Sequence, residues 1–261
     1  MRQFSFKTGA RGSETLLGTW IQMLSPESVE MAAAAGFDFV VIDTEHGFFE
    51  IGGAENLVRA ADAAGIIPLV RVARRDPTLI GKALDQGAEG TVYPGVSTPQ
   101  EAREAAAGSR YAPDGNRGAC PFVRATDHLA RDWQSFAQSS NEGAINVLLV
   151  EGAEGVQQID EIVTIPGVDA VMLGPFDLSV ALGVAGETEH PKVLEAFSRI
   201  ISSAGDHGVT VIPNIFVTDI AEAGRLADHW RSEGAGAVLV GTDKMLLADA
   251  FARFRGACAG S

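Results

Sequence analysis

Short apolar runs alternate along the chain with longer segments in which apolar residues recur at helical spacing. The apolar runs, rich in β-branched residues, lie at 16–21, 39–43, 68–72, 90–93, 145–150, 170–173, 209–212 and 237–240. Such runs predict strands that are buried on both faces, as in a parallel sheet. Helices are expected at 26–35, 54–64, 77–84, 98–107, 132–139, 155–162, 191–206, 218–227 and 244–254, and a short one near Asp177.

Eight strand–helix units without a linker-like break predict one α/β domain over residues 1–261, a (β/α)8 TIM barrel. A doubly wound sheet is the alternative, but it usually has fewer strands, and its nucleotide-binding glycine fingerprint is absent from the sequence. Residues 108–131 are rich in Gly, Pro, Asn and Arg and have no sustained period. A loop of this length in a compact domain is usually functional or disordered.

Titratable side chains follow several of the predicted strands. They are Asp43, Glu45 and His46 at the second strand, Arg71 at the third, Glu151 at the fifth and Asp177 just after the sixth. A barrel brings the carboxyl ends of its strands to one rim, so these side chains are expected to meet there. The alternative for the first group is that Asp43 caps the next turn and His46 is a surface histidine.

Glu151 and Asp177 are the candidate metal ligands. They follow adjacent strands, and two carboxylates with added water suit Mg²⁺ or Mn²⁺, with Co²⁺ also possible. No Cys/His cluster in the sequence favours structural zinc. The alternative is that Glu151 is a capping partner for the helix near Gly155 and that Asp177 is the N-cap of its own helix.

Arg71 and His46 complete the predicted chemistry. The forked donors of Arg71 suit a substrate carboxylate or a developing enolate, although a structural ion pair is the alternative. His46 is the candidate base. Together with a metal that binds a 2-oxo acid as a Lewis acid, they predict proton transfer at a carbon beside a carbonyl. No lysine is expected at a strand tip, which favours a metal mechanism over a Schiff base.

Composition excludes some partners. The net charge of −14 argues against nucleic acid and anionic membrane surfaces, which require clustered Lys and Arg. The hydrophobic fraction of 46% is enough for a large core, and the two cysteines, Cys120 and Cys258, do not indicate a disulfide framework. Residues 1–7 contain no apolar signal segment, and no stretch is long enough to cross a bilayer. A cytoplasmic protein is therefore expected.

Nine segments carry a resemblance to a known family. They are Gly18-Thr19-Trp20, Ala35-Gly36-Phe37-Asp38, Asp43-Thr44-Glu45-His46, Val70-Arg71-Val72, Leu84-Asp85-Gln86-Gly87-Ala88, Arg110-Tyr111-Ala112-Pro113-Asp114-Gly115-Asn116-Arg117-Gly118, the strand that ends in Glu151, Gly174-Pro175-Phe176-Asp177-Leu178-Ser179, and His190-Pro191. In this order the chain resembles the metal-dependent class II pyruvate aldolases of the HpcH/HpaI family, such as the 4-hydroxy-2-oxoheptanedioate and 2-dehydro-3-deoxyglucarate aldolases.

The resemblance implies a role for each site residue. Glu151 and Asp177 would hold the metal, and Arg71 would bind the pyruvate oxygen. His46, paired with Asp43, would be the acid/base, acting through a water molecule on the metal. Backbone N–H groups of the segment Gly174-Pro175-Phe176-Asp177 would bind the pyruvate carboxylate, and because Pro175 has no N–H, Phe176 and Asp177 are the donors.

The resemblance also implies an assembly. An Asp that matches Asp85 reaches the histidine of a neighbouring subunit in the family, whose usual form is a hexamer of three dimers that swap their last helix. Trp20 and Phe176 would line the aldehyde side of the pocket. For Trp20, ordinary packing inside the barrel is an equal alternative.

Three positions depart from the family pattern. Leu149 stands where many members have Gln, Gly152 where Ser is common, and Phe176 where Ala or Ser is frequent. A bulky Phe beside the site predicts short acceptors, such as aldehydes of glyoxal or glyceraldehyde size, over a long dicarboxylate semialdehyde. A Phe176→Ala variant with an unchanged acceptor profile would contradict this hypothesis.

The expected function is reversible cleavage of 4-hydroxy-2-oxo acids into pyruvate or hydroxypyruvate and an aldehyde by a metal-dependent homo-oligomer. One alternative is an acyl-CoA lyase of the citrate-lyase β or malyl-CoA type, but those enzymes are longer and more basic around the CoA site. The other is a non-catalytic barrel that binds a 2-oxo acid. Loss of His46, Arg71 or a metal carboxylate would support that alternative, and all of them are present.

Overall fold

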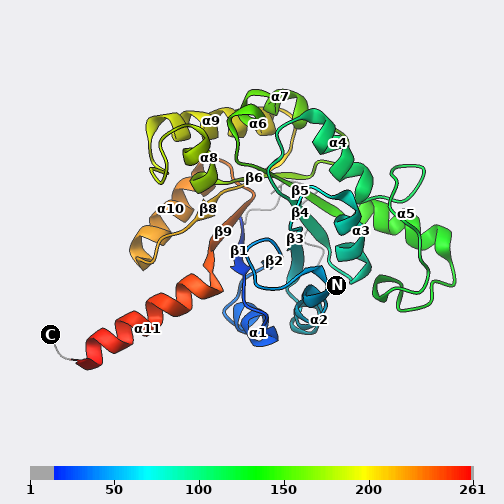
Figure 1. Cartoon of the computed structure of the whole chain (residues 1–261), viewed down its shortest axis with the longest axis horizontal. Helices are drawn as coiled ribbons and strands as arrows, with labels where there is room; N and C mark the ends of the chain where they lie inside the picture. Colours follow the sequence, from blue (N-terminus) through cyan, green and yellow to red (C-terminus); the bar gives the residue numbers. More distant parts are fainter. Residues whose placement is uncertain (1–14, 260–261) are drawn as a thin grey trace.

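The computed structural model describes residues 15–259, so the expectation for residues 1–7 lies outside the described part of the chain. Within the described part, nine parallel strands form one sheet in the order β7-β6-β5-β4-β3-β2-β1-β9-β8 (Figure 1). The strands are β1 (Leu16–Ile21), β2 (Phe39–Asp43), β3 (Ile67–Arg71), β4 (Gly90–Tyr93), β5 (Ile145–Val150), β6 (Ala170–Leu173), β7 (Thr210–Ile212), β8 (Asn214–Ile215) and β9 (Ala237–Thr242).

The two edge strands of this order, β7 and β8, are separated in the chain by Pro213 alone. Pro213 has no N–H to donate to β6, and the pairing of β7 with β6 ends at Ile212. The Pro213 carbonyl accepts a hydrogen bond from the Leu239 N–H of β9 at 3.0 Å. The two strands are therefore halves of one interrupted strand that closes the sheet, which confirms the predicted (β/α)8 barrel.

Helices cover the outside of the barrel (Figure 1). They are α1 (Pro26–Ala34), α2 (Ala54–Ala64), α3 (Pro77–Asp85), α4 (Pro99–Gly108), α5 (Trp133–Gly143), α6 (Ala153–Gln157), α7 (Ile159–Ile162), α8 (Pro175–Ala181), α9 (Pro191–Asp206), α10 (Ile220–Ser232) and α11 (Asp243–Ala259), with short 3₁₀ turns at Ile51–Gly53 and Arg124–Thr126. Local signals set their ends. A capping box of Thr98 and Glu101 starts α4, and Gly65 ends α2 in the left-handed conformation.

Several segments differ from the expectation, and among them α5 and α10 end later than expected, at Gly143 and Ser232. The helix expected at 155–162 is divided into α6 and α7, because the backbone at Gln158 leaves helical dihedral angles (φ −98°, ψ 8°). The segment before α5 has a defined path, since Asn141 donates to the Tyr111 carbonyl at 3.0 Å and accepts from its N–H at 2.7 Å. Finally, α11 is longer than the expected 244–254, has no buried residue and projects from the barrel (Figure 1).

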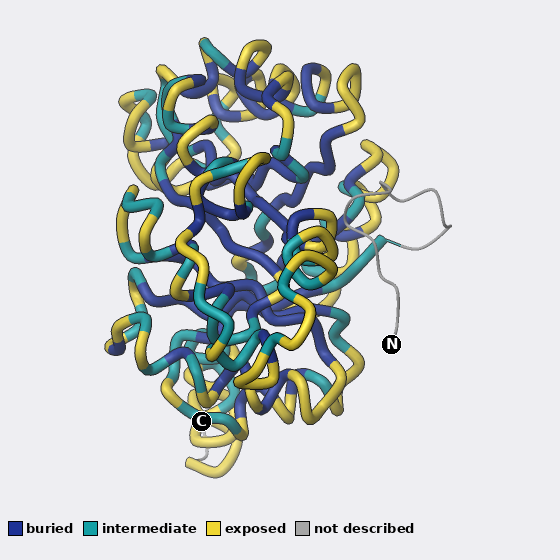
Figure 2. The backbone as a smooth tube through the Cα atoms, turned by 90° about the vertical axis from the view of Figure 1, so that its right-hand side faces the viewer, coloured by how far each residue is buried: buried dark blue, intermediate teal, exposed yellow. Residues whose placement is uncertain are grey.

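Alternate strand residues fill two different cores. Phe39 and Val41 of β2 join an apolar cluster inside the barrel, whereas Val40 and Ile42 pack with α1 and α2 outside it. Figure 2 shows the buried strands at the centre and exposed backbone around them. This alternation decides which side chains reach the barrel mouth.

No helix among the described residues is both long and apolar enough to cross a membrane.

Candidate active site

A layer of polar side chains lies directly above the apolar core of the barrel. The core takes Trp20 from β1, Val41 from β2 and Leu69 from β3. The residues that stand two positions after these in the sequence, and that face the same way, are Gln22, Asp43 and Arg71 in the same order. The same rule places Glu151 above Leu149, Gly174 above Met172 and Asn214 above Ile212. The structure therefore brings predicted residues of three strand tips to one rim.

Asp43 and Arg71 form a buried ion pair. They are direct partners in the β2–β3 register, and only 0% and 7% of their surfaces are exposed. Asp43 Oδ1 accepts from Arg71 Nε at 2.8 Å, and Oδ2 accepts from Nη2 at 2.6 Å. Burial alone would raise the pKa of Asp43, but the hydrogen bonds and charge of Arg71 outweigh it, and the pKa lies below its ordinary value.

Three further donors reach the Asp43 carboxylate. Gln22 Nε2 donates to Oδ2 at 2.9 Å, and the backbone N–H groups of Glu45 and His46 donate to Oδ1 at 3.0 and 3.1 Å. Asp43 thus caps the following turn, which was the alternative role expected from the sequence, and it also holds Arg71. It contacts His46 through the backbone, and among the described residues the exposed His46 imidazole has no hydrogen-bond partner.

Arg71 has two more neighbours at the rim. Glu45 Oε2 lies 3.2 Å from Arg71 Nη1, and the Trp20 ring centroid lies 4.5 Å from Arg71 Cζ. Trp20 is itself part of the barrel core, and its Nε1 donates to Asn214 Oδ1 at 2.7 Å. Asn214 Nδ2 in turn donates to the Leu173 carbonyl at 2.7 Å, which ties β8 to β6 beyond Pro213. Trp20 therefore packs inside the barrel and also supports the guanidinium from below.

Carboxylates gather on the other side of the rim. Burial raises the pKa of Glu151 to about 7, and the negative charges of Asp177 and Glu45 add to this effect, whereas Arg71 opposes it. Burial also raises the pKa of Glu45 despite the opposing charges of Arg71 and His46. Mutual repulsion of this kind is relieved when a cation is bound.

The two capping alternatives for the metal candidates are wrong. Gly152, not Glu151, is the N-cap of α6, and it makes no side-chain capping bond. Gly174 is the N-cap of α8, which places Asp177 in its first turn. Both carboxylates are thus left without a helix-capping role.

Gly174 leaves space beside Glu151. A Cβ atom at Gly174 would lie 2.8 Å from Glu151 Cβ and 3.1 Å from Glu151 Oε2. Among the described residues, no group of three or more His, Cys, Asp or Glu side chains could hold a metal. Two carboxylates at the rim suit a divalent cation that completes its shell with substrate and water, so the residues present fit such an ion.

The start of α8 extends the rim on this side. Pro175 opens the helix, and Phe176 follows it with an exposed side chain. The N–H groups of Phe176 and Asp177 belong to the first turn, where no intrahelical acceptor is available. They are the backbone donors that the resemblance identified.

Asp85 is not at this rim. It ends α3, on the side where the strands begin, and its Oδ1 accepts from Arg117 Nη2 at 2.7 Å. Arg117 is buried and lies over the Tyr111 ring at 4.5 Å. Within one chain the structure therefore does not bring Asp85 to His46.

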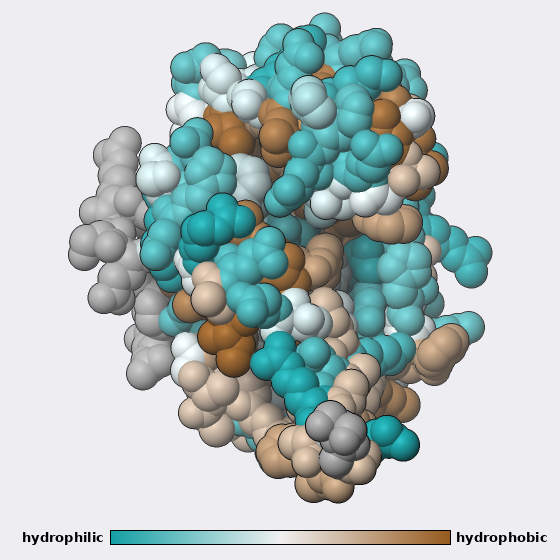
Figure 3. Space-filling view, turned by 90° about the vertical axis from the view of Figure 1, so that its left-hand side faces the viewer, coloured by the Kyte–Doolittle hydropathy of each residue, from teal (hydrophilic) through white to brown (hydrophobic). Residues whose placement is uncertain are grey.

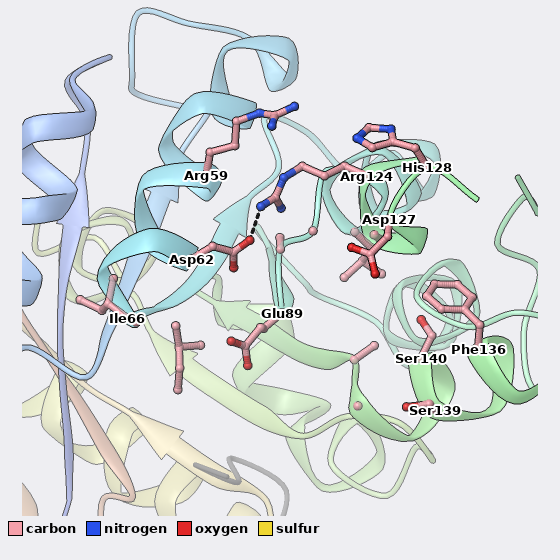
Figure 4. Close-up of a pocket in the computed structure, with 18 of the residues that line it drawn as sticks. Arg59, Asp62, Ile66, Glu89, Arg124, Asp127, His128, Phe136, Ser139 and Ser140 are labelled. Carbon is pink, nitrogen blue, oxygen red and sulfur yellow. Dashed lines mark hydrogen bonds and ion pairs between the residues drawn. The ribbon is translucent and has the colours of Figure 1, made fainter. Parts of the chain in front are cut away.

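The same end of the barrel contains a cavity of about 1180 Å³. Its wall includes Glu89, just before β4, and charged residues of α2 and the segment near Arg124 (Figure 4). Arg124 forms an ion pair with Asp62 at the wall of this cavity. The cavity is lined by neither of the metal candidates, so its size does not mark the predicted chemistry.

Gln22 and Asn214 are rim residues that the sequence analysis did not identify. Their signal is the alternation of inward-facing positions, which places Gln22 two residues after Trp20 and Asn214 two residues after Ile212. Both side chains are uncharged amides, so they are not among the titratable residues that mark the strand tips.

A closed parallel barrel with its polar layer at the carboxyl rim defines an α/β-barrel enzyme. Residues 16–250 match the family model described as HpcH/HpaI aldolase/citrate lyase. A hydroxypyruvate/pyruvate aldolase of Paraburkholderia phytofirmans is 33% identical over 223 residues, which cover 83% of this chain and 84% of that protein. A 5-keto-4-deoxy-D-glucarate aldolase of Shigella sonnei is 33% identical over 238 residues, which cover 91% of this chain and 90% of that protein.

A solved structure agrees with these relatives. An HpcH/HpaI aldolase/citrate lyase family protein from Burkholderia cenocepacia J2315 has a TM-score of 0.87 and 32% identity, with 96% of each chain covered. The chain belongs to the HpcH/HpaI aldolase/citrate lyase family. The predicted family and the predicted class, a carbon–carbon lyase of the aldolase type, are confirmed.

Proposed function

We propose that this protein is a divalent-metal-dependent aldolase that reversibly cleaves 4-hydroxy-2-oxo acids into pyruvate, or hydroxypyruvate, and an aldehyde. One observation carries the proposal: Arg71, fixed by Asp43, shares the barrel mouth with the paired carboxylates Glu151 and Asp177. The names of the related aldolases support the same substrate class.

Glu151 and Asp177 would hold the ion, and their oxygen donors favour Mg²⁺, Mn²⁺ or Co²⁺. When bound, such an ion supplies a Lewis acid for the 2-oxo acid. The charge repulsion between the two carboxylates, together with the space left by Gly174, supports this assignment.

Arg71 would bind the oxygen of pyruvate that becomes negative in the enolate. Its Nε and Nη2 are held by Asp43 and its face by Trp20, so the guanidinium is oriented before substrate arrives. The N–H groups of Phe176 and Asp177 would bind the substrate carboxylate.

His46 would be the acid/base. Its imidazole is exposed at the rim and has no hydrogen-bond partner among residues 15–259, so it is available to the reacting groups. Asp43 would act on His46 through the turn whose N–H groups it caps, in addition to its pairing with Arg71. Trp20 and Phe176 would border the aldehyde, and the bulk of Phe176 would favour short acceptors.

The decisive experiment is pyruvate release from a panel of 4-hydroxy-2-oxo acids with and without EDTA, followed by addition of Mg²⁺, Mn²⁺ or Co²⁺. We expect the chelator to abolish activity and one of the ions to restore it. Activity that is indifferent to EDTA would contradict the roles of Glu151 and Asp177.

We also propose that the chain forms a single domain and assembles as a hexamer of three dimers. One closed sheet with one surrounding layer of helices supports the single domain. The projecting α11, which buries none of its residues in its own chain, supports an exchange of this helix between subunits. In such an assembly Asp85 would approach the His46 of a neighbouring subunit.

A further inference from the structure

Gln22 occupies a position in the barrel mouth from which it can contact substrate. It directly follows β1, two residues after Trp20, and its side chain reaches Asp43. In the closed ring of strands, β1 lies opposite β5, the strand that leads to Glu151. A 2-oxo acid held between Glu151, Asp177 and Arg71 therefore has β1 on the side away from the metal carboxylates.

The backbone of Gln22 is fixed by the first residue of α11. Asp243 Oδ1 accepts from the Gln22 N–H at 2.9 Å, and Oδ2 accepts from the Met23 N–H at 3.0 Å. Two hydrogen bonds from consecutive residues to one carboxylate leave the Gln22 main chain little freedom. The position of the side chain is therefore set before substrate binds.

The orientation of the Gln22 amide is also determined. Its Nε2 donates to Asp43 Oδ2 at 2.9 Å. An ionised carboxylate only accepts hydrogen bonds, so the NH₂ group must face Asp43 and the carbonyl oxygen must point elsewhere. Among residues 15–259, no donor reaches Gln22 Oε1. The half-buried amide thus offers a single acceptor next to the Asp43–Arg71 pair.

We infer that Gln22 determines specificity, and that its Oε1 accepts a hydrogen bond from a hydroxyl group of the substrate. An amide oxygen favours a hydroxyl over a carbon-bound hydrogen or an anionic oxygen, and the nearby Asp43 and Glu45 carboxylates further disfavour an anionic group. The hydroxyl belongs either to C3 of a 3-hydroxy-2-oxo acid or to a hydroxyaldehyde. This inference rests on the proposed aldolase function and names the feature that it selects.

The test compares two substrate pairs that differ by one hydroxyl. In the first pair, pyruvate and hydroxypyruvate each react with acetaldehyde. In the second, acetaldehyde and glycolaldehyde each react with pyruvate. The kcat/KM of product formation is measured for the wild type, Gln22→Leu and Gln22→Ala.

We expect both variants to lose about three- to tenfold more kcat/KM on the hydroxylated member of at least one pair, the cost of one neutral hydrogen bond. The pair that responds identifies which substrate carries the hydroxyl. The matched control is Gln138→Leu on α5, since Gln138 Nε2 also donates to a carboxylate, that of Glu142, but on an exposed helix surface. It should leave both ratios unchanged.

Ratios unchanged within about twofold in both pairs would overturn the inference, and so would equal losses on all substrates, because these would make Gln22 a residue that only positions Asp43. Circular dichroism and the melting temperature verify that each variant is folded, and the Ala variant provides the answer if the Leu variant is not. A wild type that fails on pyruvate with acetaldehyde and on every other combination would refute the proposed function itself, and the inference with it.

Discussion

At the residue scale, Asp43 and Arg71 form a buried ion pair whose contribution to stability can be measured. Asp43 is fully buried and accepts two hydrogen bonds from the guanidinium. Asp43→Asn would leave Arg71 with Glu45 as its remaining charged partner at 3.2 Å. We expect a loss of about 3 kcal/mol in the free energy of unfolding, because breaking the buried pair leaves the guanidinium charge only partly compensated. Urea denaturation near neutral pH measures it.

Asp160→Asn is the control for this prediction. Asp160 pairs with Arg199 at 3.1 Å, but 67% of its side chain is exposed, so the change should cost less than about 0.5 kcal/mol. A cost for Asp43→Asn no larger than that for Asp160→Asn would show that the buried pair adds no more to stability than an exposed one. Because the pKa of folded Asp43 lies below 3.8, its contribution is fully present above that pH and is lost as the pH falls through the folded pKa.

The pH dependence of stability predicted for Glu151 is opposite to that for Asp43, because the pKa of Glu151 is raised. Burial, with Asp177 and Glu45, raises its pKa from 4.5 to about 7. Its carboxyl therefore favours the metal-free folded state only at low pH, and this contribution is lost as the pH rises through about 7. Without metal at pH 8, we expect Glu151→Gln to melt a few degrees above the wild type, since about 1 kcal/mol shifts Tm by about 2–4 °C in a domain of this size.

Added metal should reverse the order of the two proteins. Excess Mn²⁺ should raise the melting temperature of the wild type at pH 8 and change that of Glu151→Gln little, because ligand binding stabilises the folded state. At pH 5.5 the effect of metal on the wild type should shrink, since protons compete for the same carboxylate. Thermal scans with EDTA or Mn²⁺ measure this, and equal stabilisation of both proteins by metal would refute the ligand role of Glu151.

The rim residues show which parts of a site can be predicted from sequence. Asp43, Arg71, Glu151 and Asp177 could be identified because each ends or follows a conspicuous apolar run. The partner of Asp43 could not, because it depends on the strand register that places Asp43 opposite Arg71. An uncharged amide such as that of Gln22 has no distinctive pattern of its own, and its role depends on contacts with distant segments.

At the element scale, the junction between β6 and α8 packs Gly174 against Glu151, a proposed metal ligand. Gly174→Ala would place a Cβ 2.8 Å from Glu151 Cβ and 3.1 Å from Oε2. Since the neighbouring atoms must move, we expect Mn²⁺ affinity to fall at least about tenfold, the loss typical of disturbing the surroundings of metal ligands. Titration calorimetry with Mn²⁺ measures it.

Gly143→Ala provides the control at the end of α5. A Cβ there would meet nothing within 4 Å. This substitution should leave Mn²⁺ affinity unchanged. If Gly174→Ala also binds Mn²⁺ normally, the close packing of Gly174 on Glu151 has no role in the metal site.

The strands were easier to predict than the closure of the sheet. A parallel strand buried on both faces produces an apolar run, and the bounds of β4, β5 and β6 agree with the runs. Pro213 divides the remaining strand, and the hydrogen bonds made around it come from β9 and from Asn214. The residues at the other ends of these hydrogen bonds, Leu239 and Leu173, are distant in the chain, so composition could not reveal that the run at 209–212 continues into β8.

At the scale of the whole molecule, α11 is a helix that buries none of its residues in its own chain. The helix has 17 residues, a length of about 25 Å. Phe251 and Phe254 are 65% and 75% exposed, and the surface beside the C-terminal residues is largely apolar in Figure 3. An exposed apolar helix face of this kind indicates contact with another protein surface, and a second copy of this chain is the occupant that helix exchange predicts.

We therefore expect the double variant Phe251→Glu/Phe254→Glu to lose its oligomeric state while the barrel remains folded, because α11 buries no residue in its own chain and charges are costly in an apolar interface. Light scattering after size-exclusion chromatography should give the mass of several chains for the wild type and a smaller mass for the variant, with unchanged circular dichroism. Leu194→Glu, an exposed apolar position on α9, is the control and should keep the wild-type mass. A double variant with the wild-type mass would exclude the face of α11 that carries Phe251 and Phe254 from the interface. Because Asp243 at the start of α11 also holds the Gln22 backbone, loss of activity in the same fractions would connect assembly to the barrel mouth.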